Sequence, residues 1–157
     1  MKKKIALITG GSTGIGASVA EQLSEAGLLV VICDVNERLG IDLAEKLSGH
    51  FIYCDVTDLS SVEKAAQTCE QQLGTPSFIH LNAGIMSVPT GAPFLAIEDL
   101  SVEQYKRIVG VNLDGVFHGL KTFLPKIFFA LDAACKHTDK GSAIAASPGE
   151  IPSAKTH

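Results

Sequence analysis

The sequence has no tryptophan, only two tyrosines and little charge. Charged residues make up 19% of its 157 residues and apolar residues 46%, a balance too apolar for a disordered chain and a length that suits one domain. Basic residues are in deficit, with 13 Lys and Arg against 17 Asp and Glu, so we expect no nucleic-acid partner. No apolar run approaches the roughly 18 residues of a transmembrane helix, and the run after Lys4 is too short for a signal peptide. We therefore expect a globular protein with no membrane partner.

Cysteine pairs and histidine clusters with metal-binding spacing are also missing. Four cysteines stand far apart, none of them in a Cys-x-x-Cys pair: Cys33, Cys54, Cys69 and Cys135. A chain of this size does not depend on disulfides, so we expect reduced, mostly buried thiols and a cytoplasmic location. The same spacing predicts that the chain has no metal site.

Short apolar runs alternate with amphipathic stretches along the chain. The runs at residues 4–9, 28–33, 50–54, 78–81 and 143–146 predict buried strands. The stretches between them carry apolar residues at spacings of three and four, which predicts helices that pack on a sheet. In the first helix these residues are Ile15, Val19, Leu23 and Ala26. The alternation predicts an α/β fold with a doubly wound, Rossmann-like parallel sheet of about five strands.

Two capping signals and one proline bear on where the helices begin and end. Ser60 with Glu63, and likewise Ser101 with Gln104, fit the capping box that starts a helix. From residue 102 to about residue 137, apolar residues cover more than one face, which predicts a long helix buried from two sides. Pro125 is expected to kink or end that helix, because proline lacks the amide hydrogen and its ring clashes with the preceding turn.

A glycine-rich turn directly after the first predicted strand is the strongest functional signal. Glycine suits a tight turn that a pyrophosphate must approach closely, and the helix that follows offers free N–H groups and the positive end of its dipole. The spacing is Gly-x-x-x-Gly-x-Gly, and no Gly-Lys-Ser/Thr follows, so the turn is not a P-loop. The candidate cofactor-binding residues of this turn are Gly10, Ser12, Thr13, Gly14, Ile15 and Gly16.

Asp34 is the second functional signal, at the end of the second predicted strand and 18 residues after Gly16. A carboxylate there can accept the ribose hydroxyls of an adenosine and would repel a 2′-phosphate. Since the glycine-rich turn holds no Lys or Arg, these residues favour NAD over NADP as the cofactor. Two alternatives remain open: Asp34 caps the helix after Asn36, or Arg38 nearby favours a phosphate.

These motifs, in this order, resemble the short-chain dehydrogenase/reductase family. The resemblance covers about residues 3 to 147 and rests on five features. They are Gly10-x-x-x-Gly14-x-Gly16, Asp34, Asp55-Val56, Asn82-Ala83-Gly84 and Asn112. The resemblance implies an NAD-dependent oxidoreductase that moves hydride between the nicotinamide and an alcohol or ketone.

The resemblance also assigns roles to individual residues. Asp55 is implied to contact the adenine amino group, with Val56 beside the ring. Asn82, Ala83 and Gly84 are implied to line the cofactor cleft. Asn112 is implied to bend the long helix and hold a water of the proton relay, which makes it a candidate catalytic residue. From the residues alone, Asp55 is also consistent with an ordinary strand-end cap, and Asn112 with a satisfied buried amide.

The family's acid/base pair, Tyr-x-x-x-Lys, is the point where the resemblance breaks. Four residues after Tyr53 stands Thr57, and four residues after Tyr105 stands Val109. Ser147 matches the family's catalytic serine only after a shift of one residue, since an ungapped match places Pro148 there. Ser147 is therefore the second candidate catalytic residue, and we expect no turnover by this chain alone.

The family pattern further predicts how the chain is organised. We expect residues 1–147 to form an NAD-binding domain, a partial and truncated short-chain dehydrogenase, and residues 148–157 to be an off-pattern tail. Without the elements that the family adds, the apolar face around Phe117 and Leu120 lacks a cover. That face predicts a homo-oligomer, or association through the long helix from Val102 to Leu124. The alternatives are an inactive NAD-binding or dimer-interaction protein, or a nonfunctional truncated product.

Overall fold

The computed structural model describes residues 3–88, 93 and 95–138. Its strands are β1 (Ile5–Thr9), β2 (Leu29–Asp34), β3 (His50–Tyr53) and β4 (Phe78–Leu81). Its α-helices are α1 (Gly14–Glu25), α2 (Glu37–Lys46), α3 (Leu59–Gln72), α4 (Val102–Val109) and α5 (Gly115–Thr138). A 3₁₀ turn (Ile97–Asp99) precedes α4, and a π-helical segment (Gly110–Asp114) joins α4 to α5. The predicted strand at 143–146 and the tail at 148–157 lie outside the described residues.

The four strands form one parallel sheet in the order β3-β2-β1-β4. In this register Ile8 of β1 stands between Ile32 of β2 and His80 of β4. The chain winds from β1 outward to β3 and then returns to place β4 on the other side of β1, which is the doubly wound arrangement that the sequence predicted. The strand order therefore reverses between β1 and β4.

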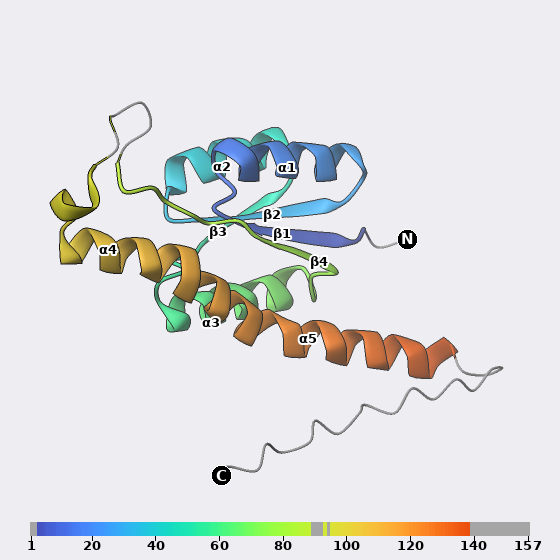
Figure 1. The fold of residues 1–157 in the computed structure, drawn as a ribbon. Coiled ribbons are helices and arrows are strands. Elements are labelled where there is room, and N and C mark those ends of the chain that lie inside the picture. Colours follow the sequence, from blue (N-terminus) through green and yellow to red (C-terminus); the bar gives the residue numbers. More distant parts are fainter. Residues whose placement is uncertain (1–2, 89–92, 94, 139–157) are drawn as a thin grey trace, which may run out of the picture.

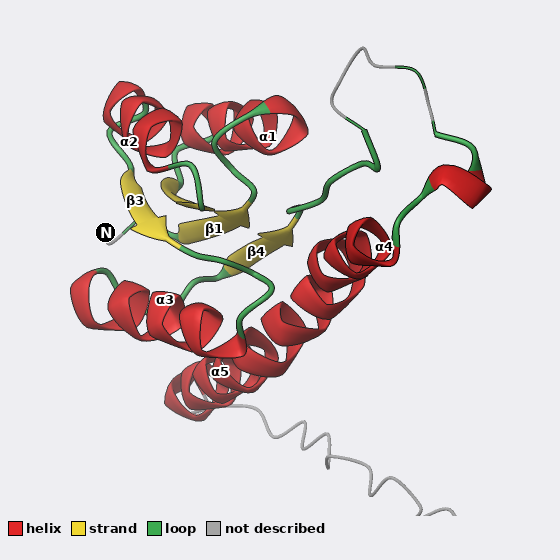
Figure 2. Ribbon diagram, turned by 90° about the vertical axis from the view of Figure 1, so that its left-hand side faces the viewer, coloured by secondary structure: helices red, strands yellow, loops and turns green. Residues whose placement is uncertain are grey.

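Helices cover both faces of the sheet (Figures 1 and 2), with α1 and α2 on one face and α3 and α5 on the other. All five residues of β1 are buried, because alternate side chains enter two separate cores. Ala6 and Ile8 pack in the core beneath α1 and α2. Ile5 and Leu7 pack in the core that also holds Phe123 of α5. Burial of each such Ile, Leu or Phe side chain contributes about 1.5–3 kcal/mol, so β1 anchors both layers.

One of the two predicted capping boxes is confirmed and the other is wrong. Ser101 caps α4, its hydroxyl accepting from the Gln104 amide while the Gln104 side chain accepts from the Ser101 amide. Helix α3 instead begins after Asp58, whose carboxylate accepts from the Ser60 backbone amide. Asp58 precedes the position that the Ser60–Glu63 pattern marked, and a carboxylate is as strong an N-cap as a serine hydroxyl.

The long helical region from residue 102 onward is present, but Pro125 does not end it. Helix α5 contains Pro125 and runs on to Thr138. Pro125 and Lys121, whose carbonyl would normally bond to residue 125, are both exposed, so water can satisfy the carbonyl that proline leaves without a donor. The regular α-helix is interrupted earlier, at the π-helical segment.

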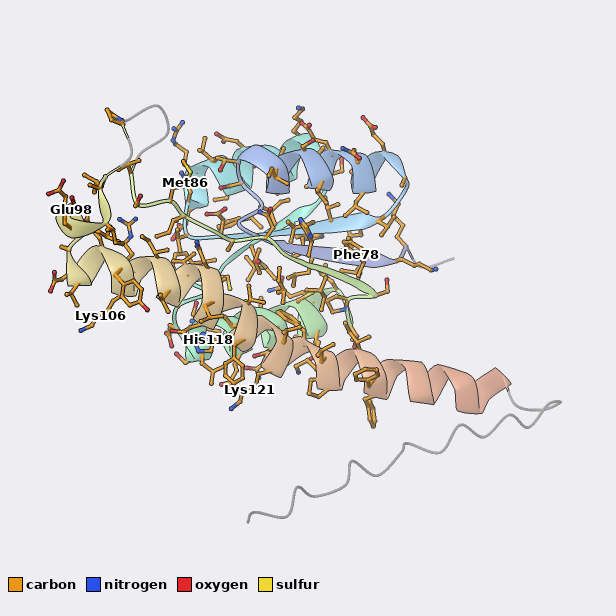
Figure 3. The ribbon with its side chains drawn as sticks, in the orientation of Figure 1. Phe78, Met86, Glu98, Lys106, His118 and Lys121 are labelled. Carbon is orange, nitrogen blue, oxygen red and sulfur yellow. The ribbon has the colours of Figure 1, made fainter. Side chains whose placement is uncertain are left out.

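The prediction that this long helix is buried from two sides is wrong for its outer side. Among the described residues Phe117 is 59% exposed and Leu113 is 65% exposed. Lys106 and Lys121 project from the same outer side, away from the sheet (Figure 3). The inner side packs closely, since a Cβ at Gly119 would lie 2.9 Å from Leu81 Cδ1. No helix within the described part of the chain is both long and apolar enough to span a membrane.

Candidate functional site

A cleft of about 720 Å³ opens at the carboxyl ends of the four strands. Gly10 follows β1, Asp34 ends β2, Asp55 follows β3 and Asn82 follows β4, and all four line this cleft. It lies where the strand order reverses between β1 and β4, the position at which doubly wound sheets bind their ligands. The predicted site residues that line it are Gly10, Thr13, Gly14, Ile15, Asp34, Asp55, Val56, Asn82, Ala83 and Gly84.

The glycine-rich turn needs its glycines for two different reasons. Gly10 and Gly14 have positive φ angles of 62° and 55°, in the left-handed region that glycine adopts without strain. Gly16 is buried, and a Cβ there would overlap the Gly10 carbonyl oxygen and approach the Asn82 Nδ2 atom to 2.6 Å. The turn therefore folds back closely on the start of α1, which leaves its backbone open to the cleft.

The start of α1 faces the cleft with its N–H groups free of side-chain caps. Thr13 is the N-cap residue, and its side chain makes no capping hydrogen bond. The first turn of α1 contains no acidic residue, so the positive end of the helix dipole is not neutralised there. Ile15 is 74% exposed and lines the cleft, so its predicted place in the stripe that packs on the sheet is wrong. These features suit an anionic group at the helix start.

Asp34 is held by three backbone or hydroxyl donors. Its Oδ2 atom accepts from the Ser12 amide at 3.0 Å and from the Ser12 hydroxyl at 2.6 Å. Its Oδ1 atom accepts from the Asn36 amide at 3.0 Å. Asn36, not Asp34, caps α2 by accepting from the Leu39 amide, so the capping alternative for Asp34 is wrong. Ser12 itself is only 9% exposed and lies beneath the turn.

Asp55 and Val56 form the wall of the cleft beyond β3. The Oδ1 atom of Asp55 accepts from the Thr57 amide at 2.9 Å and from the Thr57 hydroxyl at 2.7 Å. Asp55 thus stabilises its own turn, as the strand-end alternative proposed, and also lines the cleft. Val56 is 8% exposed, and its carbonyl oxygen lies 2.8 Å from His118 Nδ1, so the imidazole donates from that nitrogen. His118, which is labelled in Figure 3, thereby joins α5 to this wall.

The segment Asn82-Ala83-Gly84 closes the opposite wall of the cleft. The Asn82 amide and the Ala83 amide both donate to the Thr9 hydroxyl, at 3.1 and 3.3 Å. The Asn82 side chain donates to the carbonyls of Thr9 and Gly10. A Cβ at Gly10 would lie 2.7 Å from Ala83 Cα, which shows how closely the two segments pack. The end of β4 and the glycine-rich turn therefore form one connected unit.

Asn112 lies in the π-helical segment and is not itself part of the cleft lining. Its Nδ2 atom donates to the Ile85 carbonyl at 2.9 Å, and its Oδ1 atom accepts from the Ile85 amide at 2.8 Å. The side chain is exposed, so Asn112 is a satisfied amide but not a buried one. Ile85 lines the cleft, and Asn112 holds it in place. The other candidate catalytic residue, Ser147, lies outside the described residues.

Six further residues line the cleft that the sequence motifs do not include. They are Val35, Cys54, Thr57, Ile85, Arg107 and Val111. Arg107 is the only cation among the described lining residues, and it reaches the cleft because α4 lies beyond the carboxyl ends of the strands (Figure 1). Nothing local in the sequence predicts that placement, whereas Cys54 and Thr57 flank the predicted Asp55 and Val56.

The thiol in the cleft wall is not a nucleophile at neutral pH. Burial, with the nearby carboxylates of Asp55 and Asp34, raises the pKa of Cys54 to about 12. The thiol is therefore protonated, and the protonated form is a poor nucleophile. No cluster of His, Cys, Asp and Glu suited to a metal ion is found among the residues with described placement.

The sheet is parallel and doubly wound, and at its switch point a glycine-rich turn leads into a helix whose first N–H groups have no side-chain cap. These features define a nucleotide-binding domain of the Rossmann type. Comparison with known families agrees: the model of the family described as short chain dehydrogenase matches residues 4–146. The chain belongs to the short-chain dehydrogenase family.

The chain is similar to members of this family in sequence and in structure. It is 40% identical over 121 residues to a mitochondrial borneol dehydrogenase of Lavandula x intermedia, covering 77% of this chain and 45% of that protein. A Brucella melitensis 3-ketoacyl-(acyl-carrier-protein) reductase complexed with NADH has a TM-score of 0.75 at 27% identity, over 86% of this chain and 54% of that one. A gluconate 5-dehydrogenase of Burkholderia cenocepacia in complex with NADP and tartrate has a TM-score of 0.72 at 27% identity, over 83% and 51%. The chain spans about half the length of the relatives it matches.

Proposed function

We propose that this chain carries the cofactor-binding part of an NAD-dependent oxidoreductase of the short-chain dehydrogenase family. The observation that carries the proposal is the convergence of the glycine-rich turn, Asp34, Asp55-Val56 and Asn82-Ala83-Gly84 on one cleft at the switch point. The bound cofactor would exchange hydride with an alcohol or ketone substrate. The names of two relatives, a borneol dehydrogenase and a 3-ketoacyl reductase, support this substrate class.

Each wall of the cleft has its own part in binding. The start of α1 and the backbone of the glycine-rich turn would bind the pyrophosphate, because uncapped N–H groups and the helix dipole favour an anion there. Asp34 would accept from the adenosine ribose, and Asp55 with Val56 would border the adenine. Asn82, Ala83 and Gly84 would limit the cleft on the side of β4. The cleft volume of about 720 Å³ lies within the range usual for cofactor sites.

The choice of NAD over NADP rests on Asp34. A fixed carboxylate at the ribose repels a 2′-phosphate, and the turn supplies no cation to offset it. The two solved relatives hold NADH in one case and NADP in the other, so membership of the family does not choose between them. Arg107 lines the cleft from α4 but does not belong to the glycine-rich turn or to the end of β2.

The described residues that line the cleft do not include a group for proton transfer to or from the substrate. Neither of the two tyrosines is followed four residues later by a lysine. We propose Asn112 and Ser147 as the residues that this chain would contribute to a catalytic site, and we propose that the 157 residues alone bind NAD(H) without turnover. Residues 1–147 would form the binding domain. The buried free thiols of Cys33, Cys54 and Cys69 support a reducing, cytoplasmic location.

A titration of the 157-residue chain with NADH, followed by fluorescence, tests the proposal. We expect saturable binding that weakens at least about tenfold in Asp34→Ala, since a hydrogen bond to a charged group is lost. Asp42→Ala is the matched control, because Asp42 is an exposed carboxylate on α2 outside the cleft. A chain that unfolds cooperatively but shows no saturable binding would refute the proposal.

The exposed outer side of α4 and α5 is the proposed route of self-association. We expect the mass in solution to rise with concentration, and we expect Phe117→Ser to reduce that rise, because Phe117 is 59% exposed there. Ile41→Ser on α2, where the side chain is 42% exposed, is the control. Sedimentation of both variants at several concentrations distinguishes the two faces, and a strictly monomeric wild type would contradict the proposal.

A further inference from the structure

Ser12 contacts the carboxylate of Asp34 through two donors at once. Its amide lies 3.0 Å from Asp34 Oδ2 and its hydroxyl oxygen lies 2.6 Å from the same atom. The distance of 2.6 Å is typical of a strong hydrogen bond to an anionic oxygen. Ser12 is only 9% exposed, so water competes little with these bonds. The serine of the glycine-rich turn thus donates its hydrogen bonds to a residue of β2 and not to a ligand in the open cleft.

The carboxylate of Asp34 still has capacity for a ligand. A carboxylate offers about four acceptor positions. The described donors occupy three of them, two on Oδ2 from Ser12 and one on Oδ1 from Asn36. The remaining position belongs to Oδ1, while Oδ2 is held toward the turn. Asp34 therefore presents one acceptor to the cleft in a fixed direction and carries its charge at a fixed place.

We infer that Ser12 is a positioning residue for cofactor selectivity, which holds the Asp34 carboxylate where it accepts from a free ribose hydroxyl and repels a 2′-phosphate. The inference rests on the function proposed above. Asp34 is only partly buried, so without Ser12 its side chain can rotate away from the ribose. Rotation weakens the hydrogen bond to NADH and at the same time relieves the repulsion of NADPH. Ser12 thus affects the difference in binding affinity between NADH and NADPH.

The affinities of the full 157-residue chain for NADH and for NADPH test this role. We expect Ser12→Ala to lower the ratio of NADH affinity to NADPH affinity by about fivefold to tenfold, as expected when a bond to a charged group is lost. Ser12→Thr keeps the hydroxyl and should restore most of the ratio. Ser18→Ala, an exposed serine of α1, is the control and should leave the ratio unchanged. In an Asp34→Ala background, Ser12→Ala should no longer change the ratio, because the two effects are coupled.

Several outcomes overturn the inference, each in a recognisable way. If Ser12→Ala weakens NADH and NADPH equally, Ser12 contacts the cofactor or supports the fold and does not set selectivity. If the wild type binds neither nucleotide, the proposed function fails and this role fails with it. Amide exchange in the wild type gives a measurement without any variant. The Ser12 amide should stay protected after NADH binds, and loss of that protection would show that the ribose displaces Ser12 from Asp34.

Discussion

The side-chain amide nitrogen of Asn82 lies 3.0 Å from the carbonyl oxygen of Gly10 and 3.2 Å from that of Thr9. Asn82 therefore ties the end of β4 to the turn that follows β1, across the switch point of the sheet. These bonds join the wall of the cleft at the end of β4 to the glycine-rich turn. This side of the cleft is thus held in place by the fold itself before any ligand binds.

Asn82→Ala tests this bridge. The carbonyls of Thr9 and Gly10 each lose a donor in a half-buried place, so we expect the free energy of unfolding to fall by about 1–3 kcal/mol. Chemical denaturation measures the change, with Gln67→Ala, an exposed residue of α3, as the control. An Asn82→Ala variant as stable as the control would mean that the bridge does not hold the end of β4 to the glycine-rich turn.

The glycines of the turn should respond unequally to alanine. Gly14 has positive φ but open space around its Cβ position, so Gly14→Ala should cost only about 1 kcal/mol of strain. Gly16→Ala would overlap the Gly10 carbonyl and crowd Asn82, and we expect about 2–4 kcal/mol and loss of NADH binding. Denaturation curves and an NADH titration of both variants decide this. Equal destabilisation by the two substitutions would contradict the close approach at Gly16.

The N-cap of α3 should make stability depend on acid. Hydrogen bonds from the Ser60 hydroxyl and amide lower the pKa of Asp58 below its ordinary value of 3.8. A carboxyl whose pKa is lower in the folded state stabilises that state above its unfolded pKa, and this contribution is lost as the pH falls through the folded pKa. Asp58→Ser keeps a cap but removes the titration, so its denaturation midpoint should fall less on acidification than that of the wild type. An unchanged acid response would refute the role of Asp58.

The buried thiols should resist alkylation while the chain is folded. Burial is the main cause that raises the pKa of Cys54 to about 12 and that of Cys69 to about 11, and it also raises the pKa of Cys33. Near pH 8 a free cysteine is partly thiolate, whereas these three remain protonated. Site-resolved mass spectrometry after iodoacetamide treatment should show all three reacting much more slowly in the folded chain than in denaturant. Rapid labelling of Cys54 in the folded chain would contradict its burial.

Local patterns in the sequence predicted the strands and the motifs that lie next to them. Apolar runs locate β1 to β4 within one residue, because buried parallel strands are apolar on both faces. The motif residues that follow the strands reach one cleft, since parallel strands bring their carboxyl ends to the same edge. Short-range rules were also enough for the Ser101–Gln104 capping box, whose two partners are three residues apart.

Features that depend on neighbours distant in the sequence were not predictable in this way. Ile15 fits the apolar period of α1, yet its position over the cleft is decided by where the helix begins relative to the sheet. Arg107 reaches the cleft only because the fold places α4 beyond the carboxyl ends of the strands. Pro125 is compatible with α5 because Pro125 and Lys121 are both exposed, so water can reach the Lys121 carbonyl. The hydrogen bonds from Ser12 to Asp34 join residues that are 22 positions apart, and no local sequence pattern predicts them.

The π-helical segment Gly110–Asp114 sets the rotational phase of α5. Each residue of an α-helix turns the chain by about 100°, so a wider turn that takes up one additional residue rotates everything after it by that angle. Gly115 and Gly119, which lie against Val56 and Leu81, owe their inward direction to this offset. Deleting one residue here would leave the length of the helix nearly unchanged. It would, however, turn the glycine-bearing face of α5 away from the sheet. The segment is thus a point where a change of length would disturb the packing of all of α5 on the sheet.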